Sequence, residues 1–206
     1  MRTTSSIAKC ARDTKKYISD IFTSSVSVLP LGEWSTVPGP TPYCILSSWG
    51  SGEFTAQVAI INSLRYYRIA IVCDTQIIPR TIVAGITPTY PVMVYTAGVK
   101  EYLVGGMAII DPGDAYDSAK ELEDITSWLH NGGILLTHGE LFSGMEANTV
   151  VWVTPDMGMY MHGRSNASRA TNKMCVVTKS DMHELEKVRR DFNVIDLDGL
   201  GDFYFF

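Results

Sequence analysis

The chain has 206 residues, and 46% of them are hydrophobic, so it can bury a sizeable core within one domain. Its formal net charge of −5 argues against nucleic-acid binding by bulk electrostatics, which needs many Lys and Arg side chains facing phosphates. The four cysteines are far apart and show no CxxC or Cys-His spacing, so neither a zinc site nor a disulfide scaffold is indicated. We expect no metal, no cofactor, no membrane partner and a reducing compartment.

The N-terminal region predicts a short basic amphipathic helix over residues 6–22. Ile7, Ala11 and Ile18 recur at helical spacing, and the cations occupy other faces of the helix. A contact with nucleic acid or a membrane surface and a docked helix with a solvated charged face both remain open. The cations of this region are Arg2, Lys9, Arg12, Lys15 and Lys16.

An arm rich in Ser, Pro, Gly and Thr follows over residues 23–42. Its prolines hold the backbone extended and remove hydrogen-bond donors, which is typical of an arm or linker that enters a domain. From residue 43 onwards β signals dominate, with turn residues between short apolar runs. Such closely spaced short strands favour an all-β sandwich or barrel. The candidate strands are 43–49, 54–62, 66–76, 81–87, 92–96 and 102–111.

One stretch departs from this β pattern. Residues 114–130 carry apolar side chains at helical spacing, and Asn131, Gly132 and Gly133 form a C-cap signal. A strand over 107–111, this helix and a strand over 134–137 would make a βαβ unit, as in doubly wound α/β proteins. The flanking segments lack the alternating helices of a parallel sheet, so α/β is the alternative rather than the main prediction.

Residues 132–163 contain two apolar runs joined by a loop of small residues, which predicts a pair of core strands. The first run is 134–136, and the second is 149–153 with period-2 alternation continuing to residue 162. His138 and Glu140 would lie on one face of a strand, as a metal pair or an acid/base pair could. Because no third ligand has a recognisable spacing, we predict a structural or surface role for both.

The last forty residues change character again. A strand is predicted over 174–178, and Ser180 caps a helix predicted over 181–192. Arg164 and Arg169 precede the strand as further candidate phosphate contacts. The acidic tail ends in four aromatic residues, and a terminus so apolar is expected to dock on its own subunit or a neighbour.

Three segments together resemble the coat proteins of tymoviruses. Residues 36–43 are similar to the Val-Pro-Gly-Pro-Ser-Pro-Phe stretch with which the arm of that family enters its jelly-roll. Residues 102–109 resemble the family's strand ending in Ile-Gly-Gly-Ala-Ile. Residues 132–163 align with the last two strands without a gap, keeping the Leu135-Leu136 pair and ending on Met161-His162. The chain departs from the family in its more helical segment before residue 132 and its extension beyond residue 163.

The resemblance implies a divergent viral coat protein and no enzyme. It implies an N-terminal arm over 1–42, a jelly-roll β-sandwich shell domain over 43–163 and a C-terminal extension over 164–206. Copies of the chain would form an icosahedral T=3 shell around single-stranded genomic RNA, in the virion and, during assembly, in the host cytoplasm. The RNA would be bound without sequence preference by Arg2, Lys9, Arg12, Lys15, Lys16, Arg164 and Arg169. Subunit contacts would involve Val37, Pro38, Pro40, Pro42, Phe203, Tyr204, Phe205 and Phe206.

Two other functions remain open. The first is a small α/β enzyme built on residues 107–137, with His138 and Glu140 at a strand end. The second is a monomeric jelly-roll that binds a sugar or a protein through the aromatic side chains of Tyr66, Tyr67 and Trp152.

Overall fold

The fold is seen in a computed structural model that describes part of the chain: residues 4–7, 9, 38–47, 68–73, 90–96, 99–104, 107–110, 118–142, 144–154, 169–179 and 192–196. These residues are mostly β-strand, which confirms the β-rich character predicted from the sequence. The strands are β1 (Tyr43–Ser47), β2 (Ile69–Cys73), β3 (Val92–Thr96), β4 (Val99–Val104), β5 (Met107–Ile110), β6 (Ile134–His138), β7 (Ala147–Val153), β8 (Ala170–Lys179) and β9 (Asn193–Asp196), with helix α4 (Ser118–His130) between β5 and β6.

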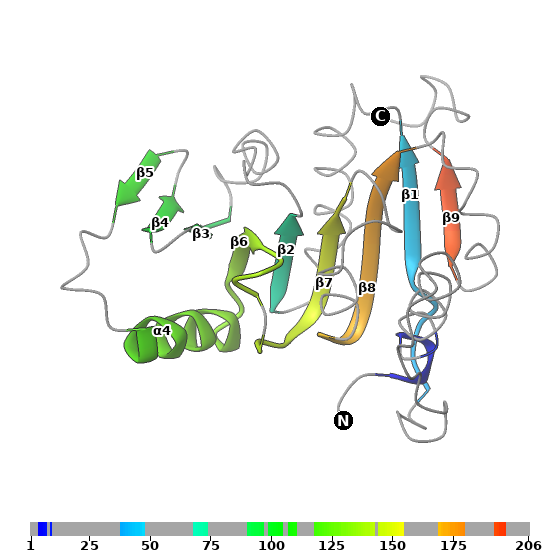
Figure 1. Cartoon of the computed structure of the whole chain (residues 1–206), viewed down its shortest axis with the longest axis horizontal. Coiled ribbons are helices and arrows are strands. Elements are labelled where there is room, and N and C mark those ends of the chain that lie inside the picture. The colour runs from blue at the N-terminus through cyan, green and yellow to red at the C-terminus, as the bar shows by residue number, and fades with distance from the viewer. Residues whose placement is uncertain are drawn as a thin grey trace, which may run out of the picture.

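The strands form one sheet in the order β5-β4-β3-β6-β2-β7-β8-β1-β9 (Figure 1). The seven strands from β3 to β9 in this order run parallel to one another, and β4 is antiparallel to both β3 and β5. A jelly-roll has two packed sheets of antiparallel strands. The predicted sandwich is therefore not the arrangement of the described strands.

The central strands are buried on both faces, which explains why they can run parallel. Ala70 and Val72 face one hydrophobic cluster, whereas Ile69 and Ile71 face a second cluster on the opposite side. All five residues of β2 are buried. Parallel sheets are covered on both faces, and their strands therefore read as continuous apolar runs rather than as alternating ones.

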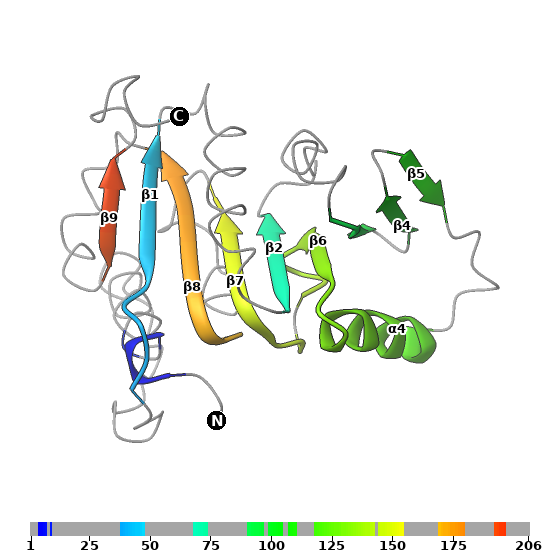
Figure 2. The same ribbon diagram turned by 180° about the vertical axis from the view of Figure 1, so that it is seen from behind.

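Segments outside the strands also contribute buried side chains to the first cluster, among them Phe192 just before β9. Ile125 and Leu129 come from α4, Phe142 comes from the connection between β6 and β7, and Ile7 comes from the N-terminal helical turn. The two opposite views place α4 beside the start of β6 (Figures 1 and 2). The predicted helix over 114–130 is thus present as Ser118–His130.

Helix α4 ends as its sequence predicts. The amide of Gly133 donates to the carbonyl of Trp128 at 3.0 Å, and the amide of Gly132 donates to that of Leu129 at 3.1 Å. Gly132 has a φ of 84°, so this pair of bonds is the Schellman arrangement that glycine favours. The indole Nε1 of Trp128 then donates to the carbonyl of Ile134 at 2.9 Å, which ties the helix to β6.

An ion pair joins α4 to the β3–β4 hairpin. The Lys100 ammonium lies 2.8 Å from a carboxylate oxygen of Asp124, and the Tyr102 ring meets the Trp128 ring edge-on at 5.3 Å between centroids.

Strand β5, helix α4 and strand β6 follow one another as a βαβ unit, because the strand pairings make β5 and β6 run in the same direction. The alternative proposed from the sequence describes this region correctly.

Strands β6 and β7 are not neighbours, contrary to the predicted strand pair. Ile71 of β2 is in register with Leu136 of β6 on one side and with Val151 of β7 on the other, and all three strands are parallel. The connection over residues 139–146 therefore crosses β2. The small side chain of Ala70 lies in the same cluster as Phe142 and Met145 of this connection.

The C-terminal region belongs to the same sheet. Strand β1 lies between β8 and β9 and is parallel to both. The boundary predicted between residues 163 and 164 therefore does not divide the described sheet.

The region predicted as one strand over 102–111 contains two strands, β4 and β5. The strands predicted over 54–62, 81–87 and 157–162 lie outside the described residues, as does the helix predicted over 181–192 except for Phe192, which is not helical.

The N-terminal residues pack on the proline-rich arm. Residues 5–7 and 9 are helical, and Ile7 is buried. The hydroxyl of Ser6 donates to the carbonyl of Gly39 at 2.8 Å, and a Cβ atom at Gly39 would collide with the side chain of Thr4. Within the described part of the chain, no helix has both the length and the apolar character that a membrane span requires.

Candidate functional site

The carboxyl ends of β2, β6 and β7 meet at one edge of the sheet, the upper edge in Figure 1. Cys73 ends β2 and is in register with His138 of β6 and Val153 of β7. These strands lie in the middle of the sheet, with at least three described strands on either side. The residues that follow them are therefore attached to the buried middle strands of a wide sheet.

The direction in which the chain leaves this edge changes at β2. After β2 the chain continues to β3, which lies beyond β6, and after β7 it continues to β8 on the other side. The next described strands after β2 and after β7 therefore lie on opposite sides of this adjacent pair of strands. In open parallel sheets, such a switch point leaves a crevice in which ligands bind.

A tight turn follows β6 at this edge. The amide of Gly139 donates to the carbonyl of Cys73 at 3.2 Å, and the amide of Phe142 donates to that of His138 at 3.0 Å. Phe142 is completely buried and anchors the turn in the core. The turn therefore presents His138 and Glu140 in a fixed backbone geometry, but Glu140 lies after the end of the strand and not on it.

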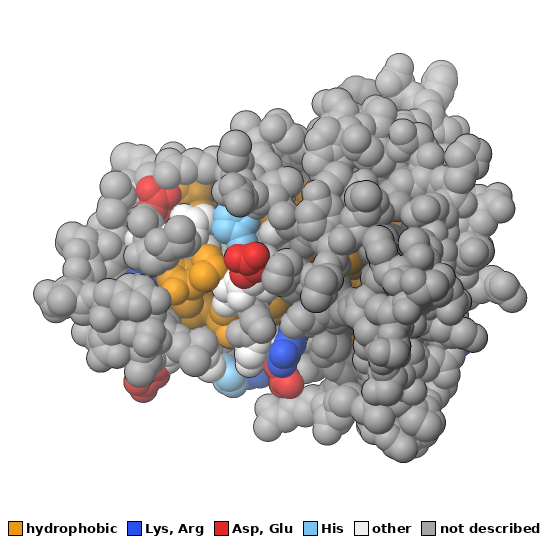
Figure 3. Space-filling model, in the orientation of Figure 1, with side chains coloured by type: hydrophobic (Ala, Val, Ile, Leu, Met, Phe, Trp, Pro, Cys, Tyr) orange, Lys and Arg blue, Asp and Glu red, His pale blue; other side chains and the backbone are white. Residues whose placement is uncertain are grey.

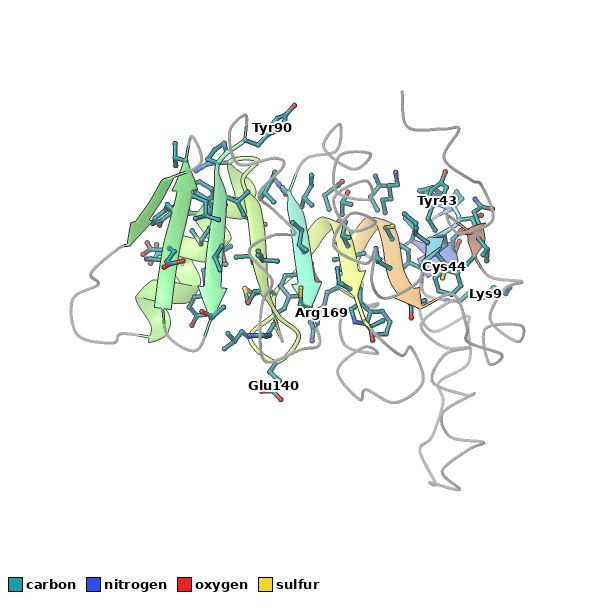
Figure 4. The ribbon with its side chains drawn as sticks, turned by 90° about the horizontal axis from the view of Figure 1, so that it is seen from above. Lys9, Tyr43, Cys44, Tyr90, Glu140 and Arg169 are labelled. Carbon is teal, nitrogen blue, oxygen red and sulfur yellow. The ribbon has the colours of Figure 1, made fainter. Side chains whose placement is uncertain are left out.

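The two polar side chains of the turn reach the surface. His138 is half-buried and Glu140 is exposed. Seen from above, Glu140 projects from one side of the sheet (Figure 4). On the face shown in Figure 3, a histidine and an acidic side chain lie next to each other over the middle of the sheet. Imidazole and carboxylate groups can accept or donate hydrogen bonds to a polar ligand and can exchange protons with it.

Threonine side chains complete this edge, and the sequence analysis did not single them out. Thr137 is buried, and its hydroxyl donates to the carbonyl of Tyr95 on β3 at 2.9 Å. Thr154 is also buried, and its amide donates to the carbonyl of Val177 at 3.0 Å. In the sequence, both residues could have been found as threonines that end an apolar run. In the described ranges, no group of three or more His, Cys, Asp or Glu side chains could hold a metal ion.

The predicted RNA contacts are only partly described. Lys9 is exposed near the β1 and β9 end of the sheet, whereas Arg169 precedes β8 nearer the middle, so the structure does not bring them together (Figure 4). Arg169 is half-buried, and its Nε atom is buried without a hydrogen-bond partner. The other predicted contacts, Arg2, Arg12, Lys15, Lys16 and Arg164, lie outside the described residues.

The predicted subunit contacts divide in the same way. Pro38 and Pro40 are exposed, as a contact surface requires. Pro42 is buried, and its carbonyl accepts a hydrogen bond from the amide of Asn193 at 2.8 Å, so it lies at the start of the β1–β9 pair. The remaining candidates, Val37, Phe203, Tyr204, Phe205 and Phe206, lie outside the described residues.

The described cysteines are free thiols in the core. Cys44, Cys73 and Cys175 are buried and form no disulfide. Burial raises the pKa of the Cys175 thiol from 9.0 to about 12, and the positive charge of Lys173 lowers it by a smaller amount. A thiol with so high a pKa is a weak nucleophile at neutral pH, so Cys175 is a packing residue.

Comparisons with known proteins give little for this chain. No family model and no curated protein matches it. Among solved structures, it is similar to the C-terminal domain of a possible DNA helicase from Lactobacillus plantarum WCFS1, with 14% identity and a TM-score of 0.45 over 94% of this chain and 98% of that one. A likeness at this level supports no inference about the function of the chain.

Proposed function

We propose that this chain is an α/β domain that binds a small polar ligand at the carboxyl ends of β2, β6 and β7. The observation that carries the proposal is the switch in chain direction at β2 within a sheet of seven parallel strands. Ligands of open parallel sheets bind at the carboxyl edge where the chain direction switches, because the diverging connections leave room there.

The side chains at this edge support the same conclusion. His138 and Glu140 follow a central strand, and both reach the surface from a turn that Phe142 anchors. Binding sites usually combine a rigid support with a few polar groups on loops. We assign His138 and Glu140 the role of orienting the ligand through hydrogen bonds.

A ligand screen followed by titration tests this proposal. Full-length protein is screened by thermal shift against nucleotides, sugar phosphates, amino acids and short oligonucleotides, and the hits are titrated by calorimetry. We expect His138→Ala and Glu140→Ala each to weaken binding about tenfold, the effect of losing one hydrogen bond to a charged group. Glu123→Ala, an exposed change on α4, is the matched control and leaves affinity unchanged. Hits that neither His138→Ala nor Glu140→Ala weakens, or a panel without hits, would contradict the proposal.

The coat-protein function implied by the resemblance stays a separate prediction. Its expected jelly-roll does not correspond to the single sheet of the described residues, so the geometry favours the ligand-binding domain. Self-assembly of the chain is nevertheless open to a direct test. Light scattering and negative-stain microscopy of the recombinant protein with and without RNA would show closed particles if the chain forms a shell, and only small species if it does not.

A further inference from the structure

We propose that strand β5 is a site of self-association, at which the sheet continues into the β5 strand of a second copy of this chain. Strand β5 (Met107–Ile110) is the last strand on its side of the sheet and pairs with β4 alone among the described strands. An edge strand offers a row of backbone donors and acceptors to any strand that can approach it. This inference does not depend on the proposed ligand site, which lies on β2, β6 and β7.

The two edges of the sheet differ in how they are protected. Strand β5 consists of Met, Ala, Ile and Ile, with no charged residue and no proline. Strand β9, at the other edge, carries the polar Asn193 and the charged Asp196. Charges and prolines are the usual means by which edge strands avoid pairing with other chains. Asp111 and Pro112 directly follow β5, so the difference between the two edges lies within the strands themselves, where β9 carries a charge and β5 carries none.

One exposed apolar side chain lies on the strand next to β5, and another precedes the strand after that. Val104 of β4 is in register with Met107 and is 44% exposed. Tyr90 is 42% exposed just before β3, at the end of the β3–β4 pair where Val104 lies, because Val92 is in register with Leu103. Tyr90 and Val104 are the large hydrophobic side chains that the described residues leave exposed. Pairing at β5 would bring a second copy next to the strand that carries Val104, whereas β4 separates β5 from the strand that follows Tyr90.

The composition of β5 favours the β5 strand of a second copy of this chain as its partner. Two β5 strands related by a two-fold axis pair antiparallel, so apolar side chains face apolar side chains across the axis. No like charges meet, because β5 carries none. A charged partner strand would gain no opposite charge from β5 and would have to bury its own.

The test introduces one charge at each edge in turn. Self-association of the full chain is measured by sedimentation equilibrium for the wild type, Met107→Lys and Asn193→Lys. Met107 is the first residue of β5 and is in register with the exposed Val104, and in an antiparallel pair of two β5 strands it would lie opposite Ile110 of the second copy. We expect Met107→Lys to weaken dimerisation by at least about tenfold, because pairing would place an unpaired charge opposite an apolar residue and remove it from water. Asn193→Lys, which adds the same charge at the exposed start of β9, leaves dimerisation unchanged.

Hydrogen exchange of the wild type gives an independent measure that needs no variant. We expect the amides of Met107–Ile110 to exchange more slowly at high protein concentration than at low, while those of Asn193–Asp196 do not change. A wild type that stays monomeric at all concentrations overturns the inference. So does a dimer that only Asn193→Lys weakens, or β5 amides whose exchange is independent of concentration.

Discussion

At the scale of single residues, Cys175 shows how burial controls chemistry in this sheet. Its thiolate would lie inside the core, so burial raises the thiol pKa to about 12 and the group stays protonated in the folded chain. In the unfolded chain the same thiol ionises near its ordinary pKa of 9.0. The thiol therefore stabilises the fold fully below pH 9, and this contribution is lost as pH rises towards 12.

Two measurements check this prediction for Cys175. At pH 8, iodoacetamide should label Cys175 in unfolded protein but not in folded protein, as peptide mass spectrometry would show. Above pH 9, the free energy of unfolding should fall by up to about 1.4 kcal/mol per pH unit through this group, and Cys175→Ala should remove that part of the slope. Rapid labelling of the folded chain at pH 8 would disagree with the proposed burial.

Gly39 provides a second prediction for a single residue. An added Cβ would collide with the side chain of Thr4, so we expect Gly39→Ala to destabilise the chain by about 1–3 kcal/mol in urea unfolding. Replacing Thr4 by Gly removes the atoms that collide. The double variant Thr4→Gly, Gly39→Ala should therefore be less destabilised than the sum of the two single variants. Additive effects would mean that residue 4 does not pack on the arm.

At the scale of elements, the sequence predicted local structure well where the signal was local. Strand β3 was predicted with its correct bounds, and α4 was predicted with its C-terminal glycines, because periodicity and capping depend on neighbouring residues. The partners of each strand could not be predicted in this way. The runs Ile69–Cys73 and Ile134–Leu136 are apolar on both faces, which is typical of buried parallel strands. Interpreting them as short sandwich strands led to the wrong sheet.

The candidate site was predicted only in part for the same reason. The sequence presents His138 and Glu140 as a possible functional pair but predicts a structural or surface role, because no third ligand has a recognisable spacing. Their position becomes informative only when β2 is seen between β6 and β7, at the point where the chain changes direction. That arrangement depends on contacts between distant segments, which a pattern within one segment does not contain.

The C-terminal cap of α4 offers a prediction at this scale. Gly132 has a φ of 84°, which costs a side-chain-bearing residue about 1–2 kcal/mol. We expect Gly132→Ala to lower the free energy of unfolding by about that amount, measured by urea unfolding followed by circular dichroism. Ser127→Ala, an exposed change on the same helix, should have an effect near zero. Equal effects of the two changes would show that the cap does not adopt this conformation in solution.

At the scale of the whole molecule, the described residues form one sheet to which both ends of the chain contribute. Ile7 packs in the same cluster as Phe192 and the central strands, and β1 lies between β8 and β9. The described residues near the two ends of the chain therefore share one core. The proposed ligand site and the proposed self-association edge lie on different strands of this sheet.

The central claim is that β2 lies between β6 and β7 and runs parallel to both, since the proposed site exists only in that arrangement. Amide-to-amide nuclear Overhauser effects in deuterated full-length protein test it directly. We predict contacts from β2 to both β6 and β7 that advance in the same direction along each pair, from Ile69 with Thr149 to Cys73 with Val153, and none between β6 and β7. Direct contacts between residues 134–138 and 147–153 would contradict the parallel sheet and restore the strand pair predicted from the sequence.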